Sequence, residues 1–167
     1  MTYYASDNGR ETKELLEGQG FVFPERPDVA DQPSLPTDVS DLEDATLMEE
    51  FALFTAWADY AAAQVGLAVI AEREAERAVE DAEAKVWQDQ MRLNPKVPVT
   101  AVKAAMSTAA KVRDARKVFD KAYAYRRLVS DLAARYERDA AVLSRELTRR
   151  TQSEWNARQA RRERWKP

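Results

Sequence analysis

Arginines at helical spacing are the residues with the clearest chemical potential in this chain. On a helical wheel at about 100° per residue, residues 110–150 gather basic side chains on one face and apolar side chains on another. The basic face comprises Arg113, Arg127, Arg135, Arg138, Arg145 and Arg149. Guanidinium groups in such a row can contact successive phosphates, because each offers several N–H donors in a planar fork. The pattern predicts a binding face for a polyanion, interrupted by Asp120 and Asp131.

Aromatic side chains lie among these basic residues. Tyr123 precedes Arg126 and Arg127, and a second group lies near the C-terminal end of the sequence. That second group comprises Trp155, Arg158, Arg161, Arg162, Arg164, Trp165 and Lys166. An exposed ring can stack on an unpaired base, whereas the bases of a duplex are already stacked on one another. The combination predicts single-stranded nucleic acid as the ligand.

A solvated helix face is the simpler interpretation of the same arginines. Glu146 and Asp139 lie close enough in sequence to pair with some of them. Residues 1–46 carry a net charge of −8, residues 47–92 of −6 and residues 93–167 of +11, so an acidic helix and a basic helix could also neutralise each other. The sequence leaves open whether the basic face binds nucleic acid or pairs with acidic helices.

Most side chains of familiar catalytic sites are missing. The chain has 0 His and 0 Cys, which excludes ordinary zinc sites, disulfides and Ser-His or Cys-His nucleophiles. Its 4 glycines form no phosphate loop and no dinucleotide fingerprint. Glu72, Glu76, Glu80 and Glu83 share a helical face that could bind a divalent cation, but a solvated flank explains them more simply. We therefore predict a protein that is not an enzyme and holds neither metal nor cofactor.

The elements that position these residues are predicted to be long helices. Of 167 residues, 33% are charged and only 4 are glycine, which favours an all-α fold. Ser40-Asp41-Leu42-Glu43 has the form of a capping box, so a helix is expected to begin there and run to Arg92. Its apolar positions step alternately by four and three residues, with Glu72 as the exception. The large seam residues are Phe51, Phe54, Trp57 and Val65.

A short elbow is predicted between this helix and a second long one. Pro95 and Pro98 end the first helix, and Thr100 is expected to cap a short helix that ends near Met106. After a break at residues 107–108, a second seam includes Leu132, Tyr136, Leu143 and Leu147. The first helix alone would be about 69 Å long at 1.5 Å per residue. The prediction is a helical hairpin with coiled-coil-like seams that forms a homo-oligomer, because such helices need partners to cover them.

Three segments follow from this pattern. Residues 1–41 are acidic and proline-rich, and they are predicted to be largely irregular. Residues 42–150 form the hairpin domain, and residues 151–167 form a basic extension that is predicted to be helical. No window approaches the roughly 20 apolar residues of a membrane helix, so we expect a cytosolic protein without membrane contact.

Three segments together resemble bacteriophage recombination mediators of the UvsY type. They are the 96–104 elbow, Ala122-Tyr123-Ala124-Tyr125-Arg126-Arg127-Leu128, and Val142-Leu143-Ser144-Arg145-Glu146-Leu147-Thr148-Arg149-Arg150. The resemblance covers roughly residues 50–150, and the acidic segment before Ser40 and the basic end after Arg150 depart from it. It implies a ring-like oligomer in the cytoplasm of an infected bacterial host. Such a protein binds single-stranded DNA and helps to load a recombinase onto strands covered by single-strand-binding protein.

The resemblance also implies which residues contact DNA. The matched positions are Arg126, Arg127, Arg145, Arg149 and Arg150, with Tyr123 as the stacking residue. Ser144 and Thr148 are alternatives for capping or cross-linking neighbouring helices. The competing hypothesis is an oligomeric helical scaffold or adaptor, such as a component of a phage particle, whose arginines pair with the acidic helix of a neighbour.

Overall fold

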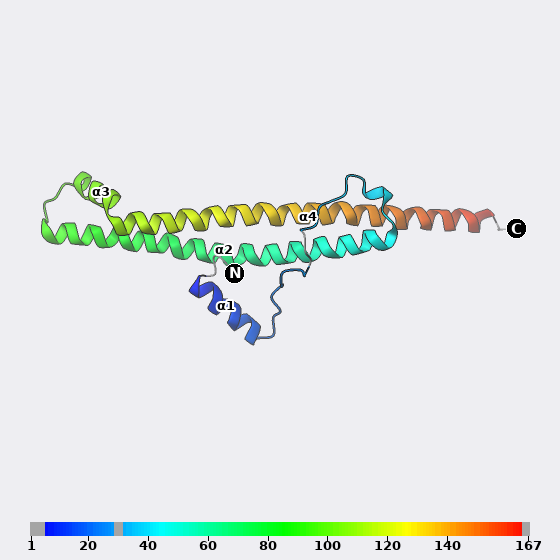
Figure 1. Cartoon of the computed structure of the whole chain (residues 1–167), viewed down its shortest axis with the longest axis horizontal. Coiled ribbons are helices and arrows are strands. Elements are labelled where there is room, and N and C mark those ends of the chain that lie inside the picture. The colour runs from blue at the N-terminus through cyan, green and yellow to red at the C-terminus, as the bar shows by residue number, and fades with distance from the viewer. Residues whose placement is uncertain (1–5, 29–31, 165–167) are drawn as a thin grey trace. The chain divides into compact units, whose positions relative to one another are not determined.

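The computed structural model describes residues 6–28 and 32–164, and helices are the only regular secondary structure in these ranges (Figure 1). The elements are α1 (Asp7–Gly18), a 3-10 turn η1 (Val39–Asp41), α2 (Asp44–Leu93), α3 (Val99–Thr108) and α4 (Ala110–Arg164). No strand occurs in these described ranges. The all-α class is confirmed, and so is the presence of two long helices with a short helix between them.

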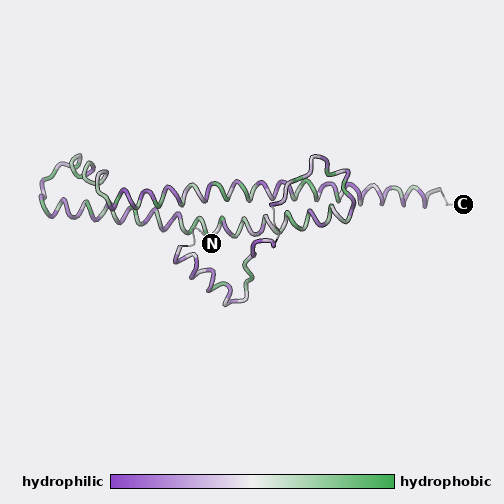
Figure 2. Tube along the Cα trace, in the orientation of Figure 1, coloured by the Kyte–Doolittle hydropathy of each residue, from purple (hydrophilic) through white to green (hydrophobic). Residues whose placement is uncertain are grey.

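The chain divides into two compact units, and each long helix contributes to both. The first unit contains residues within 1–23 and 63–130, and the second contains residues within 24–62 and 131–167. This division differs from the predicted segment boundaries at residues 41 and 150. Figure 2 shows hydrophobic and hydrophilic residues alternating along both long helices, as expected for helices with one buried side.

The expectation of an irregular segment over residues 1–41 is wrong for residues 7–18, which form α1. Ser6 caps this helix by accepting a hydrogen bond from the Gly9 amide at 3.1 Å. Gly20 ends it with φ +92, a conformation that only glycine adopts readily. Helix α1 also contacts α2, because the Asn8 amide donates to Glu74 at 3.2 Å and Gly9 is buried. These contacts place the start of α1 against α2 within the first unit.

Helix α2 begins later than predicted. The Ser40 hydroxyl donates to the Asp38 carboxylate at 2.6 Å, and the Ser40 amide donates to the same oxygen at 2.9 Å. The hydroxyl is therefore engaged in the η1 turn and does not cap α2. The first helical hydrogen bond runs from the Leu47 amide to the Glu43 carbonyl, so the capping box is not formed.

The elbow also differs in detail from the prediction. Helix α3 begins at Val99 after Pro98, which has no side-chain cap hydrogen bond, so Thr100 is not the cap. At its other end, Ser107 and Thr108 donate their hydroxyls to the Ala104 carbonyl at 2.9 and 3.0 Å. Ala109 then has φ −61 and ψ 125, an extended conformation that separates α3 from α4. Local side-chain hydrogen bonds thus compete with the helix at the predicted break.

An aromatic cluster forms the core of the second unit. Phe54 and Trp57 of α2 pack on Tyr136 of α4, with ring centroids 6.3 and 5.6 Å apart. Leu47 and Leu143 are fully buried in the same unit. Burial of large rings is worth more than burial of small side chains, so this cluster supplies much of the apolar stabilisation of the second unit.

The predicted seam residues fall into three groups. Phe54, Trp57, Tyr136 and Leu143 are buried, whereas Phe51, Val65 and Leu147 are half-buried. Leu132 is 39% exposed in the single chain, so it is not part of the core within the chain, and its predicted place in an oligomer seam stays a prediction. Val129, Ala133 and Tyr136 fill the buried positions at four- and three-residue steps, which leaves Leu132 beside the seam.

Alanines dominate the core of the first unit. Ala68, Ala71 and Ala75 of α2 are buried, as is Ala122 of α4. Small side chains allow two helices to approach closely but bury little area each. Two ion pairs, Arg126–Glu72 and Arg116–Glu83, also join the long helices in this unit, and Arg126 is one of the predicted DNA-binding arginines.

Candidate nucleic-acid interface

Arg138 and Arg145 project from the solvent side of α4 in the second unit. They are seven residues apart, which is about two turns or 10.5 Å along the helix. The buried residues Tyr136 and Leu143 lie on the opposite side of the same turns. Both arginines are exposed, and neither makes an ion pair or hydrogen bond within the described part of the chain. Their donors are therefore available to an anionic ligand.

Other members of the predicted basic face have partners or lie elsewhere. Arg135 pairs with Asp139, with Nε 3.6 Å from the carboxylate, as the simpler interpretation of the sequence anticipated. Arg127 and Arg113 are exposed in the first unit. Two members of the predicted face in the second unit, Arg135 and Arg149, thus have intramolecular partners, although both side chains remain exposed.

Arg126 links the two long helices of the first unit and does not point freely to solvent. Its guanidinium donates to Glu72, and the two side chains are 30% and 19% exposed. Glu72 is the residue that interrupts the apolar seam of α2, so Arg126 explains that interruption. Tyr123 is 49% exposed, with the Arg126 guanidinium 5.5 Å from its ring centroid. This arrangement makes Arg126 a structural residue, and it leaves Tyr123 accessible.

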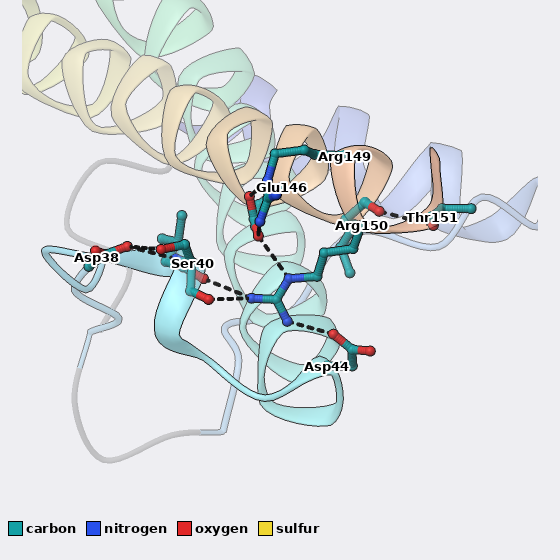
Figure 3. A network of polar contacts seen from close by, with 9 residues as sticks. Asp38, Ser40, Asp44, Glu146, Arg149, Arg150 and Thr151 are labelled. Carbon is teal, nitrogen blue, oxygen red and sulfur yellow. Dashed lines mark hydrogen bonds and ion pairs between the residues drawn. The ribbon is translucent and has the colours of Figure 1, made fainter. Parts of the chain in front are cut away.

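Arg150 organises a polar network in the second unit (Figure 3). Its guanidinium donates to Asp44 at 2.5 Å, to the Ser40 carbonyl at 2.9 Å and to the Val39 carbonyl at 3.3 Å. Its Nε donates to Glu146 at 2.8 Å. The side chain is only 19% exposed. Arg150 therefore holds the segment that precedes α2 against α4, and its donors are not free for DNA.

Glu146 is the anion at the centre of this network. Arg149 donates to both of its carboxylate oxygens at 2.7 Å, and Arg150 donates to one of them. These hydrogen bonds lower the pKa of Glu146 to about 2 and raise the pKa of both arginines. The Arg149 side chain remains 63% exposed, so it lies at the edge of the network. The sequence signal for these contacts is the spacing of three and four residues from Glu146.

The C-terminal part of α4 carries a second cationic group. Arg158 pairs with Glu154 at 3.1 Å, and both side chains are well exposed. Arg161 and Arg162 are exposed and make no ion pair within the described residues. Trp165, which was predicted to accompany them, lies outside the described residues. Exposed ion pairs such as Arg158–Glu154 are weak, so a phosphate can compete for that arginine.

A groove on α4 was not predicted from the sequence. Its volume is about 570 Å³, and it follows one side of the helix. It is lined by Ser144, Leu147, Thr148, Thr151, Gln152 and Trp155. Trp155 is 55% exposed. These positions recur at spacings of three, four or seven residues, which places them on one side of a helix. Nothing in the sequence distinguished this side of the helix from the others.

Several carboxylates of α2 pair with arginines. Glu72 and Glu83 pair with Arg126 and Arg116 of α4, and Glu76 pairs with Arg73. No group of three or more acidic side chains suited to a metal ion occurs within residues 6–28 and 32–162. Three of the four carboxylates, Glu72, Glu76 and Glu83, are therefore engaged in ion pairs with arginines.

Helix α2 does contain a window that meets the length and composition criteria for a membrane span. The prediction that no window approaches this composition was therefore wrong. One third of the window is buried within the protein. A helix that packs against other helices can have the same composition, so this feature alone is weak support for membrane insertion.

No protein-family model, curated protein or solved structure matched this chain in comparisons with known proteins.

Proposed function

We propose that this protein binds single-stranded DNA and acts, without covalent chemistry, as a recombination mediator. The observation that carries the DNA-binding part is the pair Arg138 and Arg145, two exposed cations on one side of α4 with no partner among the residues that the structure describes. Arginines with unoccupied donors bind phosphates well, because each can form two parallel hydrogen bonds. The mediator part rests on the resemblance to the UvsY-type family described above.

The proposed interface contains fewer arginines than the interface expected from the sequence. Arg138, Arg145, Arg161 and Arg162 form its centre, and Arg149 and Arg158 lie at its margin because each has an intramolecular partner. Arg126 and Arg150 are assigned structural roles instead. Arg135 is exposed but pairs with Asp139, so it also lies at the margin, whereas the exposed Tyr123 and Arg127 belong to the first unit and are candidate contacts apart from this interface.

Binding of this kind accounts for mediation by competition. A homo-oligomer with one basic α4 face per subunit would hold a strand at many points, since linked sites bind more tightly than single ones. It would compete with single-strand-binding protein for the phosphates and expose a stretch of strand to the recombinase. Strand binding and recombinase loading take place in the cytoplasm of an infected bacterial host and need no metal or cofactor.

The test is a titration of a labelled 30-nucleotide single strand, followed by fluorescence anisotropy. The variant carries Arg138→Gln and Arg145→Gln. We expect an increase in Kd of about tenfold or more, because two charge-assisted contacts to phosphates are lost. The wild-type protein should also stimulate recombinase loading on strands coated with single-strand-binding protein, and the variant should not.

A charge-matched control separates this interface from a general effect of net charge. Arg73→Gln together with Arg92→Gln removes the same charge from exposed positions on α2. This control should bind the strand with wild-type affinity. Equal weakening by both double variants, or no binding by the wild-type protein at low salt, would contradict the proposal.

A non-enzymatic scaffold or adaptor is the second candidate, and the observed ion pairs favour it. Glu72–Arg126 and Glu83–Arg116 join the acidic and basic long helices of the first unit. The same kind of pairing between subunits would use Arg138 and Arg145 in assembly. Under that hypothesis, Arg138→Gln with Arg145→Gln lowers the mass measured by light scattering, whereas the mediator hypothesis leaves the mass unchanged.

A further inference from the structure

The groove around Trp155 offers an unusual mixture of contacts on a single helix face. Trp155 is 55% exposed and Leu147 is half-buried, while the rest of the lining consists of hydroxyl and amide side chains. Arg162 lies seven residues after Trp155 and Arg158 three residues after it, so both follow the indole along the same side. One aromatic surface, several polar groups and two cations therefore lie along one side of the helix, and one of the cations, Arg158, also pairs with the exposed Glu154 at 3.1 Å.

We infer that this groove is a base-stacking subsite for a single strand of nucleic acid, in which Trp155 stacks on one unpaired base. Arg158 and Arg162 bind the neighbouring phosphates. This inference rests on the proposed function and specifies where in the protein the base, as opposed to the phosphate, is recognised. It requires an unpaired base, because a base within a duplex has no free face for the indole.

The polar lining suits the edge of a base. The Thr148 and Thr151 hydroxyls each donate to a backbone carbonyl four residues earlier, at 2.9 Å. Their donors are thus used, and their oxygens present only lone pairs toward the groove. Such acceptors match the amino and imino N–H groups that an unpaired base exposes. They would contribute little to binding a phosphate, which has no donor.

A second protein helix is a poor occupant for the same surface. Helix–helix contacts bury apolar residues repeated every three or four positions, as Phe54, Trp57 and their neighbours do in the second unit. The groove offers one large exposed apolar side chain, Trp155, and continues into exposed arginines. A ligand with one flat apolar surface and a negatively charged backbone matches the indole and the arginines that follow it in both shape and charge.

The experiment compares Trp155→Leu with Trp155→Phe in the full chain. Leucine keeps apolar volume but has no π face, whereas phenylalanine keeps a ring. Binding of a labelled 30-nucleotide oligothymidylate is measured beside binding of an abasic strand of equal length. We expect Trp155→Leu to raise the Kd for oligothymidylate about 5- to 100-fold, since stacking on one aromatic side chain is worth that much. Trp155→Phe should stay within about threefold of the wild type.

The abasic strand distinguishes stacking from a loss of charge or fold. It carries the same phosphates without bases, so wild-type protein and Trp155→Leu should bind it equally. Leu128→Ala, at a 65% exposed position of α4 outside the groove, serves as the matched control and should leave both affinities unchanged.

Three results would overturn the inference. If the wild-type protein binds oligothymidylate and Trp155→Leu binds it equally well, the stacking subsite is wrong and the proposed function survives. If the wild-type protein binds neither strand, the proposed function itself fails. If Trp155→Leu changes the mass of the assembly and weakens binding to both strands equally, Trp155 is a subunit contact.

Discussion

Individual arginines on α4 have different roles because their neighbours differ. Arg145 and Arg150 are five residues apart on the same helix. Arg145 is exposed and has no partner in the described part of the chain, whereas Arg150 has four oxygen partners. A guanidinium already satisfied by carboxylate and carbonyl oxygens gains little from a phosphate. The available donors of a residue, and not its type alone, therefore determine whether it can contribute to a binding site.

Glu146 gives a residue-level prediction for pH dependence. Its folded-state pKa is about 2, below the usual value near 4.5, because Arg149 and Arg150 donate hydrogen bonds to it. A depressed pKa stabilises the folded state fully at pH values above the unfolded pKa. This contribution is lost as the pH falls from about 4.5 to about 2, because the unfolded chain takes up the proton first. We expect the urea midpoint to decrease over that range.

The variant that tests this assignment is Glu146→Gln, measured by urea unfolding at pH 7, 4.5 and 3. It should be less stable than the wild type at pH 7 and should show a smaller decrease toward pH 3. Glu137→Gln, at an exposed position of α4, is the control and should keep the wild-type pH dependence. An unchanged pH dependence in Glu146→Gln would refute the assignment.

Each long helix is an element with two kinds of core, because it passes through both units. In the second unit, α2 contributes Phe54 and Trp57, whereas in the first it contributes small residues such as Ala68 and Ala75. The alanine-rich part buries less apolar area per residue, so helix propensity and ion pairs contribute a larger share of its stability. Changes in intrinsic helix propensity should therefore be measurable there.

Gly66 provides the element-level prediction. It lies within α2 and is exposed, and a Cβ at this position would meet no atom of the described residues within 4 Å apart from its neighbours and the nearby backbone of its own helix. Gly66→Ala should raise the free energy of unfolding by about 0.5–1 kcal/mol, because alanine loses less backbone entropy in a helix. The measurement is thermal or urea unfolding followed by circular dichroism.

The reverse substitution on the same helix is the control for Gly66. Ala84 is exposed in α2, and Ala84→Gly should lower stability by a similar amount. If Gly66→Ala lowers stability instead, then the glycine has a contact or a function that its open surroundings do not explain.

At the scale of the whole molecule, charge is the property that connects fold and proposed function. The net charge of −3 conceals an excess of acids in residues 1–92 and an excess of 11 bases over acids in residues 93–167. Part of that basic excess is neutralised within the chain by pairs such as Glu83–Arg116. The remaining exposed arginines supply the field that would attract a polyanion.

Salt dependence is the prediction that belongs to this scale. Binding of single-stranded DNA should weaken with a slope of about 0.7 in log Kd against log salt for each phosphate neutralised. Arg138→Gln with Arg145→Gln should lower that slope by about 1.4, because two phosphate contacts are removed. The slope is measured by anisotropy titrations at several salt concentrations between about 50 and 200 mM. A salt-independent affinity would contradict an interface built on phosphates.

Several features of this protein were determined by its sequence alone. The alternating four- and three-residue steps of apolar side chains predict long helices, and Pro95 and Pro98 mark the elbow between them. The absence of His and Cys removes whole classes of active site. Such features are predictable because helix periodicity and proline geometry act over a few residues.

The tertiary structure alone decided which predicted arginines are engaged and which are exposed. Arg126 pairs with Glu72 and Arg150 with Asp44, across 54 and 106 positions of sequence. The tertiary structure also decided that residues 7–18 form α1 and that Leu132 lies outside the core of the single chain. Pairing and burial depend on which side of a helix meets a distant segment, and the local pattern of residues does not contain that information.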